Sequence, residues 1–403
     1  YQYALLLASG QRVPYNLLWP PLYGECIGYI FSLFGPRVIY VQIIQIGLWL
    51  ASAFIFSGIV VKLTSSTEVK DISFILYISS PELIAFSHYL WPETVHLFLW
   101  LSSLWFLICR PFAWINTAIA GMLLGFALLT KSLLGPFVPV ILIFLFLLGP
   151  KINQKTRFIN VSLFAIMTIV ITFPMMINNL IEREVFLIAD SSVFNIWVGL
   201  NDFETMDSVN DIAGLEMEQY LQSGANLKIR NDILLDRIVQ RINKQGLFST
   251  LLNQFNKQYF RLFDVQTYFT TQLVGNHRQA YSLDSKIINI TLELYAYIEY
   301  GFILIVGILG LCFLCGWPWN WSHLFALFII YNLDIFLFLH VKTRYIIQFF
   351  PMLIFFASIS VYRAVSNKKS LQNIPDFTFN RARINIGIVI GIIIGYISFY
   401  NLI

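Results

Sequence analysis

Long apolar runs alternate with short polar segments along nearly the whole chain. A helix needs roughly 20 apolar residues to cross a bilayer, with a lower limit near 17. The runs therefore predict about ten transmembrane helices, at residues 37–61, 72–88, 94–108, 114–129, 134–148, 158–177, 287–315, 322–339, 345–362 and 384–403. The stretch 22–34 is too short to span and is flanked by Pro and Gly, which favours a helix lying in the interface.

The composition agrees with a membrane protein. Hydrophobic residues make up 58% of the chain and charged residues 12%, against roughly 25% charged in soluble domains. We therefore predict an all-α polytopic membrane protein. The net charge of +4 gives no reason to expect nucleic acid as a partner. Because Tyr1 stands within a helical apolar pattern and is not Met, we expect an upstream segment with a further span, giving eleven or more helices natively.

One polar insert interrupts the apolar runs. It covers residues 178–286 and is too long for a plain connector. Within it, residues 227–263 have helical periodicity, with one stripe formed by Ile229, Ile233, Leu234, Ile238 and Ile242. We expect four regions: a first outer loop with the interfacial helix (1–36), transmembrane helices (37–177), a helical extracytoplasmic domain capping the bundle (178–286), and transmembrane helices (287–403).

Basic residues predict the orientation, because cytoplasmic loops carry an excess of Lys and Arg. Loops on one side hold most of them, namely Lys62, Lys70, Arg110, Lys151, Lys155, Arg157, Arg363, Lys368, Lys369, Arg381 and Arg383. The other side holds Lys131, Lys342 and Arg344 as exceptions. We therefore place 1–36 and 178–286 outside, and expect a bacterial inner or plasma membrane protein of the cell envelope.

The predicted outer face gathers polar residues from distant parts of the chain. They are Glu25, Trp91, Pro92, Glu93, Lys131, Asn178, Asn179, Asn195, Asn201, Asp202, His340, Lys342 and Arg344. Cations can hold a lipid phosphate and offset the charge that grows on it as a bond breaks. A carboxylate can take the proton of an incoming nucleophile. This combination suits group transfer from a lipid phosphate.

Structural roles compete with these functional ones. Glu93 follows a Pro at a helix start, where a carboxylate complements the helix dipole. Lys131 could reach the headgroups by snorkelling, and Arg344 could contact headgroups too. Glu25 either faces the cavity or caps the interfacial helix. His88, His96 and His340 are metal ligands with Glu93 or hydrogen-bonded boundary residues; the sequence leaves a divalent metal open.

Several stretches, taken in order, resemble the C-type integral-membrane glycosyltransferases, which include the protein O-mannosyltransferases and the lipid A aminoarabinose transferase. The stretches are residues 3–10 with 20–23 and 33–35, Pro92-Glu93-Thr94, residues 125–131, residues 174–179 with 194–201, and Arg344-Tyr345 with Pro351. Each stretch alone is a weak indication of the family. The resemblance is more specific because the stretches occur in the family's order and on the same predicted sides of the membrane.

The resemblance implies inverting transfer of a sugar from a polyprenyl-phosphate donor to an acceptor at the outer face. It assigns Lys131 and Arg344 to the donor phosphate, and we add their neighbours His340 and Tyr345. Glu93 would belong to the active-site rim, as a candidate catalytic residue. The substrate cavity would include Asn179, Asn195 and Asn201. Partners would be the lipid-linked sugar, an unidentified acceptor and membrane lipid, with no cofactor required by the motifs.

The family's presumed base is an acidic residue in the first outer loop, just before the helix that opens this chain. No residue here matches it, since the only carboxylate of that loop is Glu25, beyond Pro20-Pro21. We expect the base upstream of Tyr1, with Glu25 as the candidate within the chain.

Two other classes of protein compete with the enzyme. A lipid or solute transporter would use ionisable residues deep inside spans. Asp334, Glu293 and Glu299 are the main examples here. A non-catalytic assembly subunit would gain weight only if no upstream segment exists.

Overall fold

The chain folds as an all-α bundle. The computed structural model describes residues 1–11, 19–148, 152–189, 192–201, 227–265, 267, 269–270, 283–314, 319–366, 377 and 381–400. Its described residues are predominantly helical, and the β pairing among them is one isolated bridge between Leu314 and Phe377. The predicted fold class, an all-α polytopic membrane protein, is confirmed.

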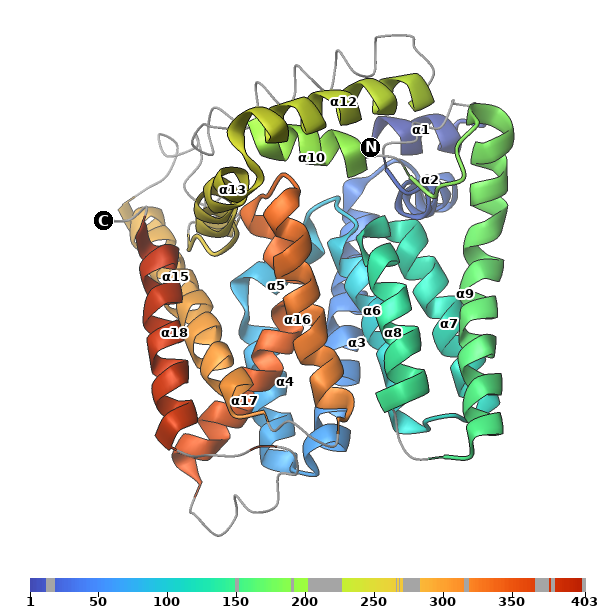
Figure 1. Ribbon diagram of the computed structural model, residues 1–403. Helices are drawn as coiled ribbons and strands as arrows, with labels where there is room; N and C mark the ends of the chain where they lie inside the picture. Colours follow the sequence, from blue (N-terminus) through green and yellow to red (C-terminus); the bar gives the residue numbers. More distant parts are fainter. Residues whose placement is uncertain are drawn as a thin grey trace.

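The helices follow one another as a bundle closed at one end by helices that run across it (Figure 1). The elements are α1 (Gln2–Ala8), α2 (Leu22–Phe34), α3 (Val38–Thr64), α4 (Thr67–Ser79), α5 (Pro81–His88), α6 (Glu93–Cys109), α7 (Trp114–Thr130), η1 (Ser132–Phe137), α8 (Val138–Ile143), η2 (Phe144–Leu148), α9 (Gln154–Arg183), α10 (Ser192–Asn201), α12 (Leu227–Gln245), α13 (Leu247–Leu262), α15 (Leu283–Cys312), α16 (Trp321–Phe338), η4 (Thr343–Gln348), α17 (Phe350–Val365) and α18 (Arg381–Phe399).

Nearly every predicted apolar run is helical, but fewer helices than expected have the length of a span. Within the described ranges, five helices are long and apolar enough to cross a membrane: α3, α9, α15, α16 and α18. A sixth candidate is the pair α5 and α6, bent by 114°. The helices α7 and α17 are shorter, as is the run 132–147. These short apolar helices can stay in a bilayer because longer neighbours shelter them.

The predicted span 72–88 is not one helix. Ser80 adopts an extended backbone conformation between α4 and α5, and Pro81 begins α5. Proline disfavours the helical conformation for the residue before it and cannot donate the helical hydrogen bond. A single helix over this run is therefore wrong, and the chain turns inside the bundle instead.

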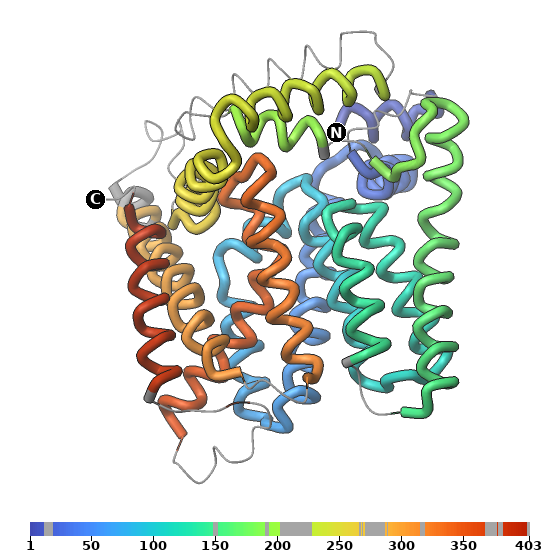
Figure 2. The backbone as a smooth tube through the Cα atoms, viewed as in Figure 1, coloured from blue at the N-terminus to red at the C-terminus, as the bar shows by residue number. Residues whose placement is uncertain are grey.

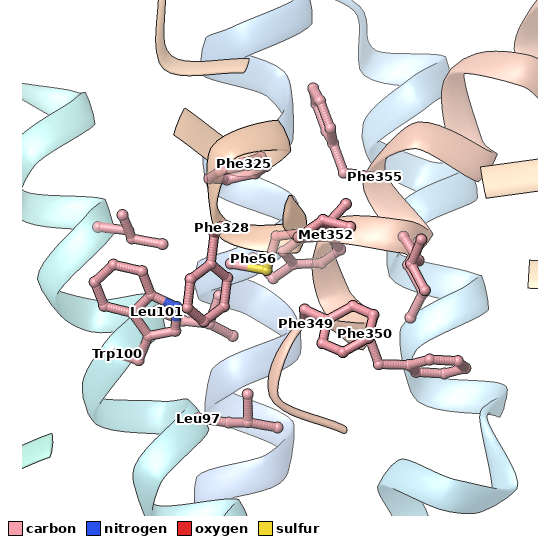
Figure 3. Packing of buried hydrophobic residues seen from close by; sticks show 14 of the residues in the cluster. Phe56, Leu97, Trp100, Leu101, Phe325, Phe328, Phe349, Phe350, Met352 and Phe355 are labelled. Carbon is pink, nitrogen blue, oxygen red and sulfur yellow. The ribbon is translucent and has the colours of Figure 1, made fainter. Parts of the chain in front are cut away.

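Aromatic packing fills the centre of the bundle (Figure 3). Trp100 of α6 packs against Phe328 of α16, with ring centroids 5.3 Å apart, and against Phe137 at 6.4 Å. α17 is apolar on all sides, and its residues from Phe350 to Ser360 are buried. A helix without a polar face belongs in the interior, which explains how a helix of 16 residues occupies the core.

The end of the bundle that carries both termini also carries the crossing helices. Figure 2 shows the tube of α12 lying over this end, with α10 beneath it and α1 and α2 beside it. The described residues of the predicted first outer loop, in α1 and α2, thus lie at the same end as α10 and α12 of the polar insert. Which side of the membrane this end faces stays a prediction.

Glycines allow α7 and α9 to approach closely. A Cβ atom on Gly121 of α7 would lie 2.5 Å from the carbonyl oxygen of Phe164 in α9. One turn later, a Cβ on Gly125 would lie 2.6 Å from the side chain of Ile171. Small residues four apart let membrane helices pack backbone to backbone. The α7–α9 contact therefore requires glycine.

We predict that Gly121→Ala lowers the free energy of unfolding by about 1–3 kcal/mol, the usual cost of overpacking a core. Gly47→Ala is the matched control, because a Cβ there meets no atom within 4 Å. Thermal unfolding of both variants in the same detergent checks this. Equal midpoints for the two variants would contradict the packing argument.

Candidate active site

A short half-buried coil, 89–92, connects α5 to α6 at the bend between them. Polar contacts hold this bend in place. The Thr94 hydroxyl donates to the carbonyl oxygen of Phe86 at 2.8 Å across the bend. The amide of Gln45 in α3 donates to the carbonyl oxygens of Ser87 at 3.0 Å and Tyr89 at 2.7 Å. The bend therefore has a fixed shape, and it fixes where α6 begins.

Glu93 and Lys131 form a buried ion pair. Lys131 Nζ lies 3.3 Å from Glu93 Oε1, and the two side chains are 17% and 4% exposed. Glu93 opens α6, and Lys131 directly follows the neighbouring helix α7. A helix favours an anion at its N-terminus and a cation at its C-terminus. Both helix ends therefore support the pair.

Arg344 joins this pair from a distant part of the chain. After α16 ends, the segment 339–349 returns into the bundle before α17 begins. The Arg344 guanidinium lies 4.3 Å from the centre of the Trp91 ring, in the coil between α5 and α6. The Tyr345 ring lies 5.2 Å from Lys131 Nζ. Glu93 interacts electrostatically with both Lys131 and Arg344.

We call Trp91, Glu93, Lys131, Arg344 and Tyr345 the cation cluster. These five residues comprise two cations and one carboxylate, so the cluster as defined carries a net positive charge. Cation–π contacts with Trp91 and Tyr345 stabilise the cations without neutralising them. An arginine and a lysine together are the usual partners of a phosphate group. The cluster is therefore suited to bind an anion.

His340 lies at the entrance of the returning segment. Its side chain is buried, and its backbone N–H donates to the carbonyl oxygen of Asn195 in α10 at 2.9 Å. A Cβ on Gly199 would lie 2.6 Å from the same nitrogen of His340. The Asn195-x-x-x-Gly199 spacing thus lets α10 lie directly on this segment, four residues before Arg344.

The other predicted cavity residues make local contacts. The Asn179 amide donates to the carbonyl oxygens of Leu187 at 2.7 Å and Ile188 at 3.3 Å, closing the turn after α9. Asn201 donates to Trp197 of its own helix at 2.7 Å. These bonds give both residues a structural role, and their place in a substrate cavity stays a prediction.

Glu25 lies on the opposite side of α2 from Tyr23, because residues two apart in a helix point about 200° apart. Tyr23 interacts electrostatically with Glu93, whereas Glu25 interacts with Tyr3 of α1. Burial raises the pKa of the Glu25 carboxyl above its ordinary value. A role for Glu25 as base stays a prediction, and the geometry places it beside α1.

Tyr23 and Gln45 were not predicted as site residues. The Tyr23 hydroxyl donates to Gln45 Oε1 at 2.7 Å, and Gln45 in turn holds the bend. A tyrosine and a glutamine in apolar helices carry no motif, so only proximity in the fold identifies them.

The histidines do not gather around Glu93 as a metal centre. His96 is buried, with Nδ1 3.1 Å from the carbonyl oxygen of Ala127, and it joins α6 to α7. His88 Nδ1 lies 2.9 Å from the carbonyl oxygen of Ile84 in its own helix. Among the described residues, no group of three or more His, Cys, Asp or Glu side chains could hold a metal ion.

Comparisons with known proteins give a distant likeness. No family model matches the chain, and no curated protein matches it. Two solved structures are similar. One is ArnT from Cupriavidus metallidurans bound to undecaprenyl phosphate, with a TM-score of 0.38, 12% identity, and coverage of 96% of this chain and 82% of that chain.

The other is the same enzyme in the apo state, with a TM-score of 0.37, 13% identity, and coverage of 88% of this chain and 71% of that chain. These neighbours belong to the group that the sequence motifs resemble. At these TM-scores and identities the likeness does not extend to function.

We predict that Lys131→Met destabilises the protein by up to about 3–5 kcal/mol, because it leaves the buried Glu93 without its ion-pair partner. The double variant Glu93→Gln/Lys131→Met should lose less than the two single variants added together. Thermal unfolding of the four proteins gives this double-mutant cycle. Simple additivity would show that the pair has no energetic coupling.

Proposed function

We propose that the protein transfers a sugar from a polyprenyl-phosphate donor to an acceptor at the membrane surface. The observation that carries this proposal is the meeting of Lys131 and Arg344 at one buried carboxylate, with aromatic rings beside both cations. The two basic side chains come from segments more than two hundred residues apart. Two partly buried cations that meet between apolar helices favour an anionic ligand.

The chemistry follows from the charges. In an inverting transfer, the acceptor attacks the anomeric carbon while the bond from that carbon to the phosphate oxygen breaks. Negative charge then grows on the departing polyprenyl phosphate. Lys131 and Arg344 stabilise this charge by charge-assisted hydrogen bonds. Glu93 positions the Lys131 ammonium group through the ion pair.

The acceptor must also lose a proton. Glu93 is already engaged by Lys131, so we assign it to positioning and place the base elsewhere. The candidate that the sequence offers within the chain is Glu25, beside α1, and burial raises the pKa of its carboxyl, which makes it a stronger base. We further propose that the cluster opens to the outer side, because the basic loops of the sequence lie at the opposite end.

We predict that Lys131→Ala and Arg344→Ala each lower sugar transfer by about 100- to 1,000-fold, the usual effect of removing one group that stabilises a developing anion. The assay uses purified protein in nanodiscs with a panel of polyprenyl-phosphate sugars, and it measures release of polyprenyl phosphate. Lys70→Ala is the control, because Lys70 lies at the start of α4 and pairs with Asp71 at 3.2 Å. Unchanged turnover in both site variants would reject the donor-phosphate assignment.

A transporter is the second candidate. Two observations favour it: the span α5–α6 is bent by 114°, and two buried carboxyl groups lie within electrostatic range of each other inside the bundle. These are Glu82 at 3% exposure and Glu299 at 7%. Broken helices and buried ionisable groups are typical of transporters. Asp334 does not add to this view, because its side chain is exposed beside Tyr259.

Reconstitution separates the two functions. In liposomes, an enzyme forms a new glycosidic bond and releases polyprenyl phosphate. Movement of a lipid-linked sugar between the leaflets without a new bond would favour transport. We expect bond formation, with loss of that activity in Arg344→Ala.

A further inference from the structure

The helix α13 is amphipathic, and a polar stripe of its side chains faces the bundle. Its side chains that face the bundle are mostly polar: Thr250, Gln254 and Gln258 are buried, together with Leu262. They are spaced four residues apart, so they form one stripe. A helix that only covered a protein core would turn its apolar stripe inward. Here the inward stripe is polar.

The polar stripe binds backbone carbonyl groups of the bundle. Gln258 donates to the carbonyl oxygen of Gly199 at 3.1 Å, and Lys257 donates to the same oxygen. Gln254 donates to Leu337 of α16 at 3.3 Å. The Tyr259 hydroxyl donates to Leu333 of the same helix at 3.0 Å. Hydrogen bonds therefore dock most of α13, and apolar packing on the bundle is confined to its last turn, with Tyr259, Phe260 and Leu262.

Other apolar residues of α13 are exposed. Phe248 is 80% exposed, Leu252 51% and Phe255 45%. Their spacing of four and three residues places them on one face of the helix. Ser249, Asn253 and Asn256 are exposed on the adjoining face. The outward half of α13 is thus divided lengthwise into an apolar stripe and a polar stripe, the pattern of a helix lying in a membrane interface.

The position of α13 fits this pattern. Phe260 packs against Tyr396 and Tyr400, with ring centroids 6.5 Å and 5.1 Å apart. Shortly after the helix, the N–H of Val265 donates to the carbonyl oxygen of Ser398 at 3.1 Å. Tyr396 and Ser398 belong to the last turn of α18, and Tyr400 directly follows it. α18 contains a candidate span of 18 residues from Ala382. Such a helix covers about 27 Å, close to the thickness of the hydrocarbon core. α13 therefore ends at the level of a membrane boundary.

The charge of this region suits a lipid surface. Residues 227–262 hold seven basic and two acidic side chains. The basic ones are Lys228, Arg230, Arg237, Arg241, Lys244, Lys257 and Arg261. Near an anionic leaflet, basic residues add about 1 kcal/mol each to membrane attraction. Apolar insertion and headgroup attraction would act together.

We propose that the stripe of Phe248, Leu252 and Phe255 is inserted into the lipid leaflet beside the end of α18, with basic residues of α12 and α13 other than Lys257, which binds the bundle, on anionic headgroups. The occupant of this apolar face is lipid. For α13, this adds a membrane contact to the extracytoplasmic domain that the sequence suggests for residues 178–286. The proposal does not depend on the sugar-transfer function.

Spin labelling tests it in the intact protein. A ketone-bearing phenylalanine analogue carrying a nitroxide replaces Phe248, Leu252 or Asn253 one at a time, in nanodiscs of phosphatidylcholine and phosphatidylglycerol. Power saturation compares collisions with oxygen, which concentrates in lipid, and with a neutral nickel chelate, which stays in water. All three positions are exposed, so labelling leaves the fold intact, and Asn253 is the matched control on the polar stripe.

We expect the oxygen-to-nickel ratio to be about tenfold higher at 248 and 252 than at 253, as expected for apolar burial in a leaflet. High nickel accessibility at 248 would place the stripe in water and overturn the proposal. Low accessibility to both reagents would indicate a protein partner and would overturn it equally. In nanodiscs without phosphatidylglycerol, the oxygen-to-nickel ratio at position 248 should be lower. An unchanged ratio would reject the claim that basic residues bind anionic headgroups.

Discussion

The burial of positive charge beside one carboxylate constrains the arrangement of this bundle. Lys131 and Glu93 lie 3.3 Å apart in an apolar surrounding, where a lone charge would be expensive. Because both stand at helix ends, the pair requires α6 to begin where α7 ends. That requirement in turn needs the bend after α5, and the bend presents Trp91 to Arg344. Ion pair, bend and returning segment thus depend on one another.

Interrupted helices are the means by which polar groups reach the interior. The bend between α5 and α6 and the return after α16 both bring non-helical backbone into the bundle. Such backbone is tolerated at membrane depth only where protein surrounds it or a cavity receives it. Here the amide of Gln45 satisfies two carbonyl groups of the bend. The backbone carbonyl oxygen of Asn195 accepts a hydrogen bond from the N–H of His340 in the returning segment.

Hydrogen bonds to backbone carbonyl groups also hold α13 of the polar insert on the bundle. α13 meets the bundle through glutamine amides and turns aromatic residues outward. In water, this arrangement would expose apolar surface without compensation. At a membrane boundary, the polar stripe of α13 would contact the bundle and its apolar stripe would contact lipid. On the proposal made above, α13 contacts both the bundle and the lipid leaflet.

The sequence by itself determined the class of fold and the positions of nearly all helices, because apolar runs and helix-end residues are local signals. It also singled out Glu93, Lys131 and Arg344, since charges next to apolar runs stand out. The tertiary structure decided which of them meet. It brought Glu93, Lys131 and Arg344 together, left Glu25 beside α1, and tied Asn179 to a turn. The structure also divides the run 72–88 into two helices at Ser80. Tyr23, Gln45 and Glu82 become candidate functional residues only through their contacts or burial in the fold. Pairing between distant segments depends on packing and helix direction, which no local pattern in one sequence encodes.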